Sequence, residues 1–268
     1  SLNIRTHVVN IDRYNINFLK EFFLILSLIF TLIKVKPRTI ISYTIKPVIY
    51  GTLCALVLRI KNKFNIITGL GFFFIGKKTF KQKLIRKLIL ILYKIVIKIN
   101  TKTFFQNEDD LKLFKRLKLL SNLSSVCVIN GSGVNLEYFK KTNLPKRNIT
   151  FLLIARLLKS KGIYEFVNAA KLIKKKYKKV NFIIVGGFEK TTDSISFDDL
   201  KKWIDTNVIE WHDHVLDVRP YIRNSHIYVL PSYREGTPRT VLEAMAIGRP
   251  IITTNVAGCR HLINKNSK

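Results

Sequence analysis

The chain has 268 residues, of which 47% are hydrophobic and 11% aromatic, and this composition excludes an intrinsically disordered protein. Its formal net charge of +30 at pH 7 is typical of proteins that bind nucleic acid or an anionic membrane surface. An AT-rich genome, which favours Lys, Ile and Asn codons, accounts for the same excess, so both explanations stay open.

The start of the chain carries neither the charged segment nor the cleavage site of a signal peptide. The longest apolar run, Phe22 to Ile33, is shorter than the roughly 20 residues that a membrane-spanning helix needs. We therefore expect a buried helix there.

Short β-branched runs alternate with longer helical patterns along the first half, which predicts a parallel α/β architecture. Asn107 followed by three acidic residues is a typical helix start. The predicted strands are 5–11, 39–43, 64–68, 103–106 and 125–129, and the predicted helices are 15–34, 48–60, 78–99 and 108–119.

Pro145, Lys146 and Arg147 interrupt this pattern, and a second alternating series follows. We therefore predict two Rossmann-like domains, residues 1–145 and 146–268. Such folds bind ligands beyond the carboxyl ends of their strands. The predicted strands of the second are 150–155, 181–185, 208–211, 227–230 and 251–254, and its helices are 161–177, 196–205, 217–224 and 238–247.

The segment from Ile227 to Thr254 reads as one strand–helix–strand unit. Thr237 is the expected N-cap of its helix, with Pro238 at the first helical position. The backbone N–H groups of Arg239 and Thr240 would then form an anion-binding site at the helix start.

Two carboxylates, Glu235 and Glu243, bracket this helix start. Eight residues of helix correspond to about 12 Å of rise and about 80° of rotation, so the two cannot act as a close pair on one atom. Either they hold two ends of one elongated ligand, or Glu235 is a solvated loop acid and Glu243 a surface residue.

The stretch Glu235-Gly236-Thr237-Pro238, followed by Leu242-Glu243-Ala244, resembles the E-x7-E motif of the retaining glycosyltransferases of family 4, which have the GT-B fold. Further stretches of the second half also match the family, namely Ala155-Arg156 with Lys161-Gly162, Val185-Gly186-Gly187, Asp217-Val218, Leu230-Pro231-Ser232 and Gly248-Arg249-Pro250-Ile251-Ile252. The resemblance extends more weakly over the first half, through YTIKPVIYG (43–51), TGLGFFF (68–74), FFQNEDD (104–110) and GSGVNLEYF (131–139), and so covers nearly the whole chain.

The resemblance implies a role for each matching residue. Arg156 and Lys161 would grip the diphosphate of a nucleotide sugar, because the leaving diphosphate gains charge as the glycosidic bond breaks. Glu243 would accept hydrogen bonds from the ribose hydroxyls, and Glu235 would lie beside the donor sugar. The remaining expected substrate-binding residues are Gly236, Thr237, Pro238, Thr240, Val241, Gly69 and Gly71.

Two departures from the family stand out. Many members carry a His after the strand that matches 64–68, whereas here the place reads Thr68-Gly69-Leu70-Gly71, which leaves the catalytic partner of the first domain unnamed. The family's opening strand with its Gly-rich loop, and its C-terminal helices, have no counterpart. We therefore expect a fragment.

The resemblance implies transfer of a hexose or N-acetylhexosamine from a nucleotide sugar, which we expect to be UDP-linked, to a lipid-linked saccharide. The expected location is cytoplasmic, peripheral on the inner face of the membrane. No Asp-x-Asp occurs in the chain, so we expect neither a metal nor another cofactor.

Residues 77–102 predict a basic helix with a broad apolar face, in which Lys83, Arg86, Lys87 and Lys94 alternate with Leu and Ile. Such a helix suits an anionic bilayer surface. The alternative is an ordinary helix with one face in the core.

Three other functions were weighed. A nucleic-acid-binding protein would interleave basic and aromatic residues, but the aromatics cluster in apolar runs, so no nucleic-acid partner is expected. An NAD-dependent epimerase needs G-x-G-x-x-G after the first strand, whereas Gly131-Ser132-Gly133 lacks the third Gly and lies mid-chain. A truncated or degenerate non-catalytic relative stays open.

Overall fold

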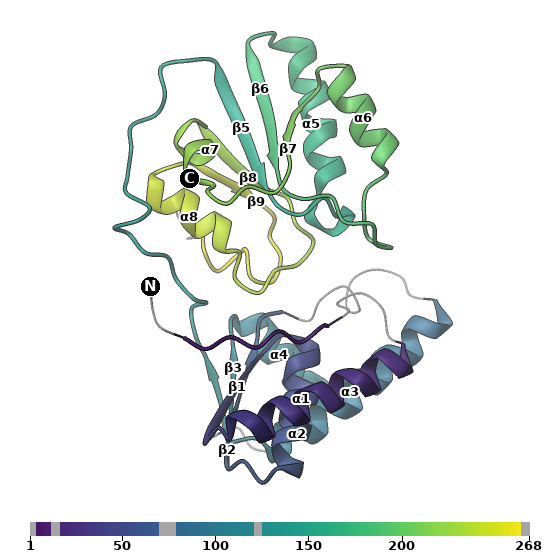
Figure 1. The fold of residues 1–268 in the computed structure, drawn as a ribbon. Coiled ribbons are helices and arrows are strands. Elements are labelled where there is room, and N and C mark those ends of the chain that lie inside the picture. The colour runs from purple at the N-terminus through teal and green to yellow at the C-terminus, as the bar shows by residue number, and fades with distance from the viewer. Residues whose placement is uncertain (1–3, 12–16, 70–78, 121–124, 264–268) are drawn as a thin grey trace. The chain divides into compact units, whose positions relative to one another are not determined.

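The computed structural model describes residues 4–11, 17–69, 79–120 and 125–263. It divides into two compact units, Ser1–Ile129 and Asn130–Lys268, and each contains one parallel sheet with its connecting helices (Figure 1). The predicted α/β class with two parallel sheets is therefore confirmed.

The first unit holds a four-stranded sheet in the order β1-β2-β3-β4. Right-handed crossovers between successive parallel neighbours place the connecting helices on one face of such a sheet. The elements are α1 (Phe18–Val35), β1 (Thr39–Tyr43), α2 (Ile45–Val57), β2 (Asn62–Ile67), α3 (Phe80–Ile99), β3 (Lys102–Phe105), α4 (Glu108–Arg116) and β4 (Val126–Val128).

The second unit holds a five-stranded parallel sheet in the order β7-β6-β5-β8-β9, so β5 lies at its centre between β6 and β8. Its elements are β5 (Ile149–Ile154), η3 (Lys159–Lys161), α5 (Ile163–Lys176), β6 (Val180–Val185), α6 (Phe197–Asp205), β7 (Glu210–His212), α7 (Arg219–Arg223), β8 (Ile227–Leu230), α8 (Arg239–Ile247) and β9 (Ile251–Thr253).

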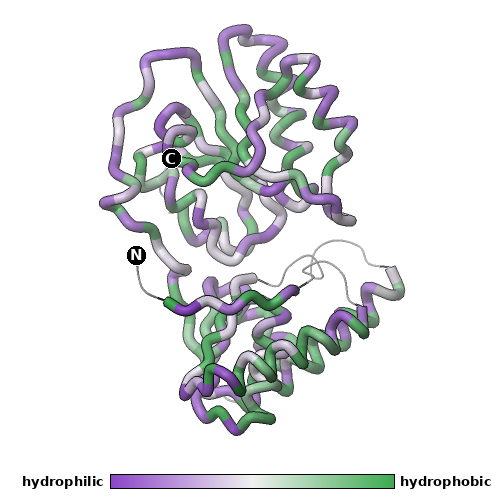
Figure 2. Tube along the Cα trace, in the orientation of Figure 1, coloured by the Kyte–Doolittle hydropathy of each residue, from purple (hydrophilic) through white to green (hydrophobic). Residues whose placement is uncertain are grey.

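Both units have an apolar core between sheet and helices, and Figure 2 shows the apolar segments that supply it. In the first unit, Phe114 packs edge-on against Phe105 and Tyr93, with ring centroids 4.9 and 5.2 Å apart. The expected helix start at Asn107 is confirmed, because its side chain accepts a hydrogen bond from the Asp110 amide at 2.8 Å. In the described part of the chain, no helix combines the length and apolarity needed to cross a membrane.

The structure corrects the domain boundary, which lies between Ile129 and Asn130 and not at residue 145. The reason is that the segment after β4 is bound to the second unit. Phe139 is part of that unit's core, and buried Arg249 donates to the carbonyl oxygens of Thr142 and Asn143 at 2.7 and 3.0 Å. Proline and charge in a segment therefore did not mark the boundary here.

Two further expectations are wrong. Residues 5–11 form no strand, because no strand in the described ranges pairs with them and an extended segment needs a partner for its backbone groups. Helix α1 forms as predicted but is not buried. It packs against α2 through Leu24 and through an ion pair between Glu21 and Lys46, and most of its large apolar side chains are exposed.

Candidate active site

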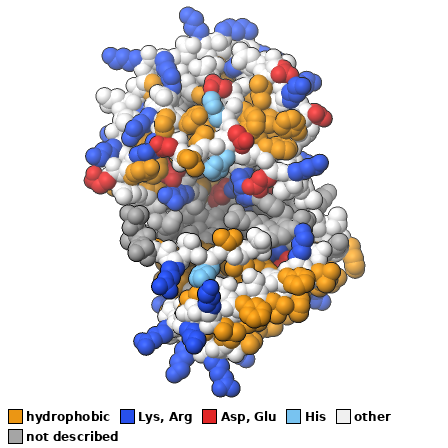
Figure 3. All heavy atoms as spheres, viewed as in Figure 1, with side chains coloured by type: hydrophobic (Ala, Val, Ile, Leu, Met, Phe, Trp, Pro, Cys, Tyr) orange, Lys and Arg blue, Asp and Glu red, His pale blue; other side chains and the backbone are white. Residues whose placement is uncertain are grey.

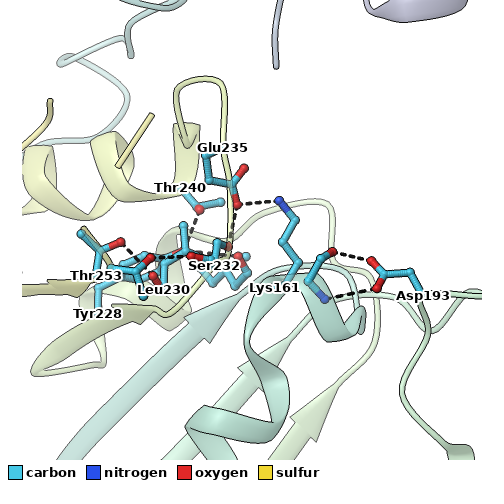
Figure 4. A network of polar contacts seen from close by, with 11 residues as sticks. Lys161, Asp193, Tyr228, Leu230, Ser232, Glu235, Thr240 and Thr253 are labelled. Carbon is cyan, nitrogen blue, oxygen red and sulfur yellow. Dashed lines mark hydrogen bonds and ion pairs between the residues drawn. The ribbon is translucent and has the colours of Figure 1, made fainter. Parts of the chain in front are cut away.

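The carboxyl ends of two neighbouring strands of the second unit, β5 and β8, bring the candidate residues together. The turn η3 follows β5 and ends at Lys161, while the loop after β8 carries Ser232 and Glu235. Because parallel neighbours end at the same sheet edge, residues about 70 positions apart meet there (Figure 4).

An ion pair forms the centre of this site. Lys161 Nζ lies 2.5 Å from Glu235 Oε1, and both side chains are largely buried. The same carboxylate oxygen accepts a hydrogen bond from Ser232 Oγ at 2.6 Å, and the Glu235 amide donates to the Ala257 carbonyl at 3.1 Å. Glu235 is therefore held at its backbone and at its side chain, and it is not the solvated loop acid of the alternative reading.

Two glycines permit the close packing around this pair. Gly162 has a φ of 74°, and a β-carbon there would lie 2.2 Å from the Pro231 carbonyl oxygen. Gly258 has a φ of 80°, and its β-carbon would lie 2.4 Å from the carbonyl oxygen of Glu235. Any larger residue would push the Lys161 turn or the Glu235 loop away, because both contacts are with backbone.

Asp193 holds the Lys161 turn from the other side. Its carboxylate accepts hydrogen bonds from the backbone N–H of Ser160, at 3.3 Å, and from the Ser160 hydroxyl. Its carbonyl oxygen accepts from the Lys159 amide at 2.7 Å. Asp193 and Ser232 were not expected from the sequence, since their roles depend on pairings that no local pattern shows.

Helix α8 begins beside Glu235, but its start differs from the prediction. The N-cap is Pro238 and not Thr237, and this proline side chain makes no capping hydrogen bond. In the described part of the chain, the Arg239 and Thr240 amides have no acceptor, as predicted for an anion site, whereas the Val241 amide donates to the Pro238 carbonyl at 3.1 Å. The Tyr228 hydroxyl hydrogen-bonds Thr240 Oγ1 at 2.6 Å and fixes this first turn.

Glu243 lies in the second turn of α8 and is 6% exposed, so it is not a surface residue. Arg239 Nε lies 3.0 Å from its Oε1. Burial raises the pKa of the Glu243 carboxyl, and the neighbouring Arg239 guanidinium opposes the rise. Glu235 is paired with Lys161 and Glu243 with Arg239, so the two carboxylates are held by different cations.

Arg156 lies just after the end of β5 and pairs with a different acid, Glu189. Its guanidinium lies 3.5 Å from Glu189, and both side chains are about 40% exposed, at 42% and 43%. The strands bring Glu189 near because the Ala155 amide donates to the Val185 carbonyl at 3.0 Å. Glu189 is a second acid that sequence reasoning missed.

The other predicted residues divide between the units. Gly236 and Pro238 are buried in the loop before α8, and Thr237 faces Gly131, whose β-carbon would lie 2.6 Å from the Thr237 side chain. Gly69 lies in the first unit after β2, with a φ of 116°. Gly71 lies outside the described residues. Within the described ranges, no three His, Cys, Asp or Glu side chains gather as metal ligands would.

Two α/β units, each with a parallel sheet, are the features of the GT-B fold. Residues 148–268 match the family model of the group 1 glycosyl transferases, and this domain belongs to that family. The fold agrees with that of Anabaena HepE in complex with UDP (TM-score 0.67, 16% identity, 90% of this chain and 65% of that one). It also agrees with sucrose-phosphate synthase from Thermosynechococcus elongatus (TM-score 0.72, 18% identity, 93% and 65%).

Bacterial relatives share sequence with most of the chain. It is 33% identical to the N,N'-diacetylbacillosaminyl-diphospho-undecaprenol alpha-1,3-N-acetylgalactosaminyltransferase of Campylobacter jejuni, over 80% of this chain and 58% of that protein. It is 26% identical to the capsular polysaccharide biosynthesis glycosyltransferase CapM of Staphylococcus aureus, over 94% and 67%. The chain thus spans roughly three fifths to two thirds of these relatives' lengths. The expected resemblance to glycosyltransferases of capsule and lipid-linked saccharide assembly is confirmed.

Proposed function

We propose that the chain is part of a retaining glycosyltransferase that moves a hexose or N-acetylhexosamine from a UDP-sugar to an undecaprenyl-diphosphate-linked saccharide. The observation that carries the proposal is the buried Lys161–Glu235 pair beside the open amides at the start of α8. Support for the donor comes from HepE, whose structure holds UDP, and support for the acceptor from the C. jejuni relative.

In this proposal the parts of the donor bind at separate places on the second unit. The Arg239 and Thr240 amides and the α8 dipole favour an anion, so the diphosphate would lie at this helix start, within reach of Lys161. As the glycosidic bond breaks, the leaving diphosphate gains negative charge, which the Lys161 ammonium and these amides stabilise. Arg156 would add a second cation from the β5 end.

Binding of a diphosphate requires Lys161 to divide its hydrogen bonds. Its ammonium has three donors and uses one on Glu235, so it can contact a phosphate oxygen without leaving the carboxylate. Glu235 would then remain beside the donor sugar, and its hydrogen bond from Ser232 would keep its orientation. Glu243, one turn further along α8, would accept the ribose hydroxyls.

The full-length protein should be incubated with a panel of UDP-sugars and a membrane extract that contains undecaprenyl-diphosphate-linked saccharides. We expect transfer from one donor, with retained anomeric configuration in the product by NMR. Glu235→Gln should reduce turnover while leaving UDP affinity near the wild-type value, and the exposed Glu137→Gln should change neither. If no donor is turned over and UDP does not bind in calorimetry, the non-catalytic alternative replaces the proposal.

We also propose a location at the cytoplasmic face of the membrane, and a second apolar face of α3 supports the membrane contact. Its buried face includes Tyr93 and Val96. The side chains of Leu84, Leu88, Ile91 and Ile95 form a separate stripe that is 45–62% exposed. Exposed Lys83, Lys87 and Lys94 flank this stripe, so core packing alone does not account for the helix.

A further inference from the structure

A hollow of about 560 Å³ lies at the amino ends of β1 and β2, where the turns that follow α1 and α2 meet. Thr39 pairs with Asn62 in the sheet, so the residues before them, Arg38 and Lys61, are brought side by side. Lys36 and Arg59 line the same hollow. Four cations from two separate turns therefore surround one cavity.

These cations lack negative partners. The structure gives none of the four an ion pair within the described residues, and the sequence contains no Asp or Glu between Glu21 and Glu108. A general compositional bias does not explain this, because Asp and Glu recur throughout the second unit, from Glu137 to Glu243.

The backbone around the hollow is also unusual. Lys36 and Arg59 have φ angles of 48° and 55°, in the left-handed region that residues other than Gly, Asn and Asp rarely adopt. The Lys36 amide donates to Leu32 at 2.8 Å and the Arg59 amide to Leu56 at 3.0 Å, so both helix ends are fixed.

The negative ends of the α1 and α2 helix dipoles do not balance the charge of the four cations. Each helix C-terminus carries about half a negative charge, so the two ends together offset about one of the four positive charges. A net positive charge remains in the hollow, and it favours an anion.

The apolar surface beside the hollow indicates which kind of anion fits. Leu32 and Ile33 line the hollow, and Phe30, one turn earlier on α1, is exposed. Figure 3 shows basic side chains gathered at the lower end of the first unit in that view, beside apolar side chains. A ligand with a phosphate next to hydrocarbon matches both features, whereas a free phosphate matches only the cations.

We propose that this hollow, formed by Lys36, Arg38, Arg59 and Lys61, binds the headgroup phosphate of an anionic phospholipid in the bilayer. The proposal rests on the membrane position of the proposed function and names the lipid contact that supports it. It involves elements of the first unit only and none of the residues assigned to the donor.

The test compares two triple variants of the whole chain in sedimentation with vesicles of phosphatidylcholine, with and without phosphatidylglycerol. Arg38→Gln/Arg59→Gln/Lys61→Gln neutralises the hollow, and Lys175→Gln/Lys178→Gln/Lys179→Gln removes the same charge from exposed positions of the second unit. We expect the first variant to lose at least about tenfold in affinity for phosphatidylglycerol vesicles, since each cation at such a surface contributes about a factor of five. The control should bind like the wild type, and circular dichroism should show both folded.

Equal loss in both variants, or no loss in the first, would overturn the site while leaving the proposed function intact. If the wild-type protein sediments equally with and without phosphatidylglycerol, both the lipid site and the proposed membrane position are wrong. The proposal for donor binding would not be affected by that result. A third arm uses inorganic phosphate as competitor. Sodium chloride of equal ionic strength is the control for this arm. If millimolar phosphate displaces the wild-type protein from the vesicles and the chloride control does not, the hollow is a free-phosphate site and the lipid assignment is wrong.

Discussion

Glu243 and Glu235 differ in what surrounds them, and this difference separates their roles. Glu235 has short contacts with the Lys161 ammonium and the Ser232 hydroxyl, which fix the orientation of its carboxylate. Glu243 is more deeply buried, and its ion-pair partner Arg239 is largely exposed. The Glu243 carboxylate can therefore still accept hydrogen bonds from a ligand. The Glu235 carboxylate already accepts hydrogen bonds from Lys161 and Ser232, which hold the site together.

Replacing Glu243 should therefore weaken donor binding more than it disturbs the fold. Glu243→Ala removes the expected acceptor of the ribose hydroxyls, and a hydrogen bond to a charged group contributes about 1.5–3 kcal/mol. We expect UDP affinity to fall by about ten- to a hundredfold in calorimetry. The exposed Glu137→Ala serves as control. Unchanged affinity in the Glu243 variant would remove this residue from the donor site.

The raised pKa of Glu243 predicts a pH-dependent cost to stability. Because burial raises the folded-state pKa, the unfolded chain releases this proton at lower pH than the folded protein does. The cost is absent below the ordinary Glu pKa of about 4.3, appears as the pH rises through the interval between the two pKa values, and is complete above the folded one. Glu243→Gln should thus raise Tm at neutral pH, and the gain should vanish near pH 4.3. If the increase in Tm persists near pH 4.3, it does not come from the raised pKa of Glu243.

The family resemblance was sufficient to single out Lys161, Glu235 and Glu243 as candidate site residues, and their roles stay predictions. It was not sufficient for their supports. Asp193 reaches Ser160 across 33 residues, and Gly258 packs on Glu235 through backbone contacts that only the folded sheet creates. Short polar side chains and glycines without local periodicity carry no signal of such pairings.

At the level of elements, strands and helices were predictable wherever a periodic pattern met a partner in the chain. β1 and β8 have the predicted bounds because each β-branched, apolar run finds partner strands: β1 pairs with β2, and β8 pairs with β5 and β9. Residues 5–11 show the same pattern without a partner strand in the described ranges and form none. Helix α1 has the right period but lies exposed, because periodicity does not reveal which face of a helix is covered.

The basic residues of helix α3 are predicted to hold the protein on an anionic membrane surface. Changing Lys83, Arg86, Lys87 and Lys94 to Glu should release the protein from anionic vesicles, because each cation contributes about 1 kcal/mol near such a surface and reversal adds repulsion. Sedimentation at low salt checks this, with circular dichroism for folding. The matched control reverses Lys171, Lys175, Lys176 and Lys179, which are exposed on or directly after α5. If the α3 variant sediments like the wild type, the exposed stripe of α3 contacts something other than a bilayer.

At the level of the whole molecule, charge and chemistry are divided between the two units. The first contains the acid-free stretch between Glu21 and Glu108, with the exposed apolar stripe of α3. The second contains the Lys161–Glu235 pair, the open start of α8 and a mixture of acids and bases. This division suits the proposed enzyme, whose acceptor is held in a membrane and whose donor is a soluble anion. The first unit would contact the membrane that holds the acceptor, and the second unit would bind the donor.

This division also predicts how the reaction responds to chelation. A diphosphate can be neutralised by a bridging divalent ion or by protein cations with a helix start, and the donor unit offers Lys161, Arg156 and the α8 amides for that purpose. We expect transfer by the full-length enzyme to continue at the wild-type rate in EDTA, measured as UDP release with the acceptor membrane extract. Lys161→Ala should instead lower the rate by about a hundredfold or more, the range seen when one donor to a developing oxyanion is removed. A rate that falls in EDTA and recovers with manganese or magnesium would mean that a metal, and not Lys161, carries the charge of the leaving diphosphate.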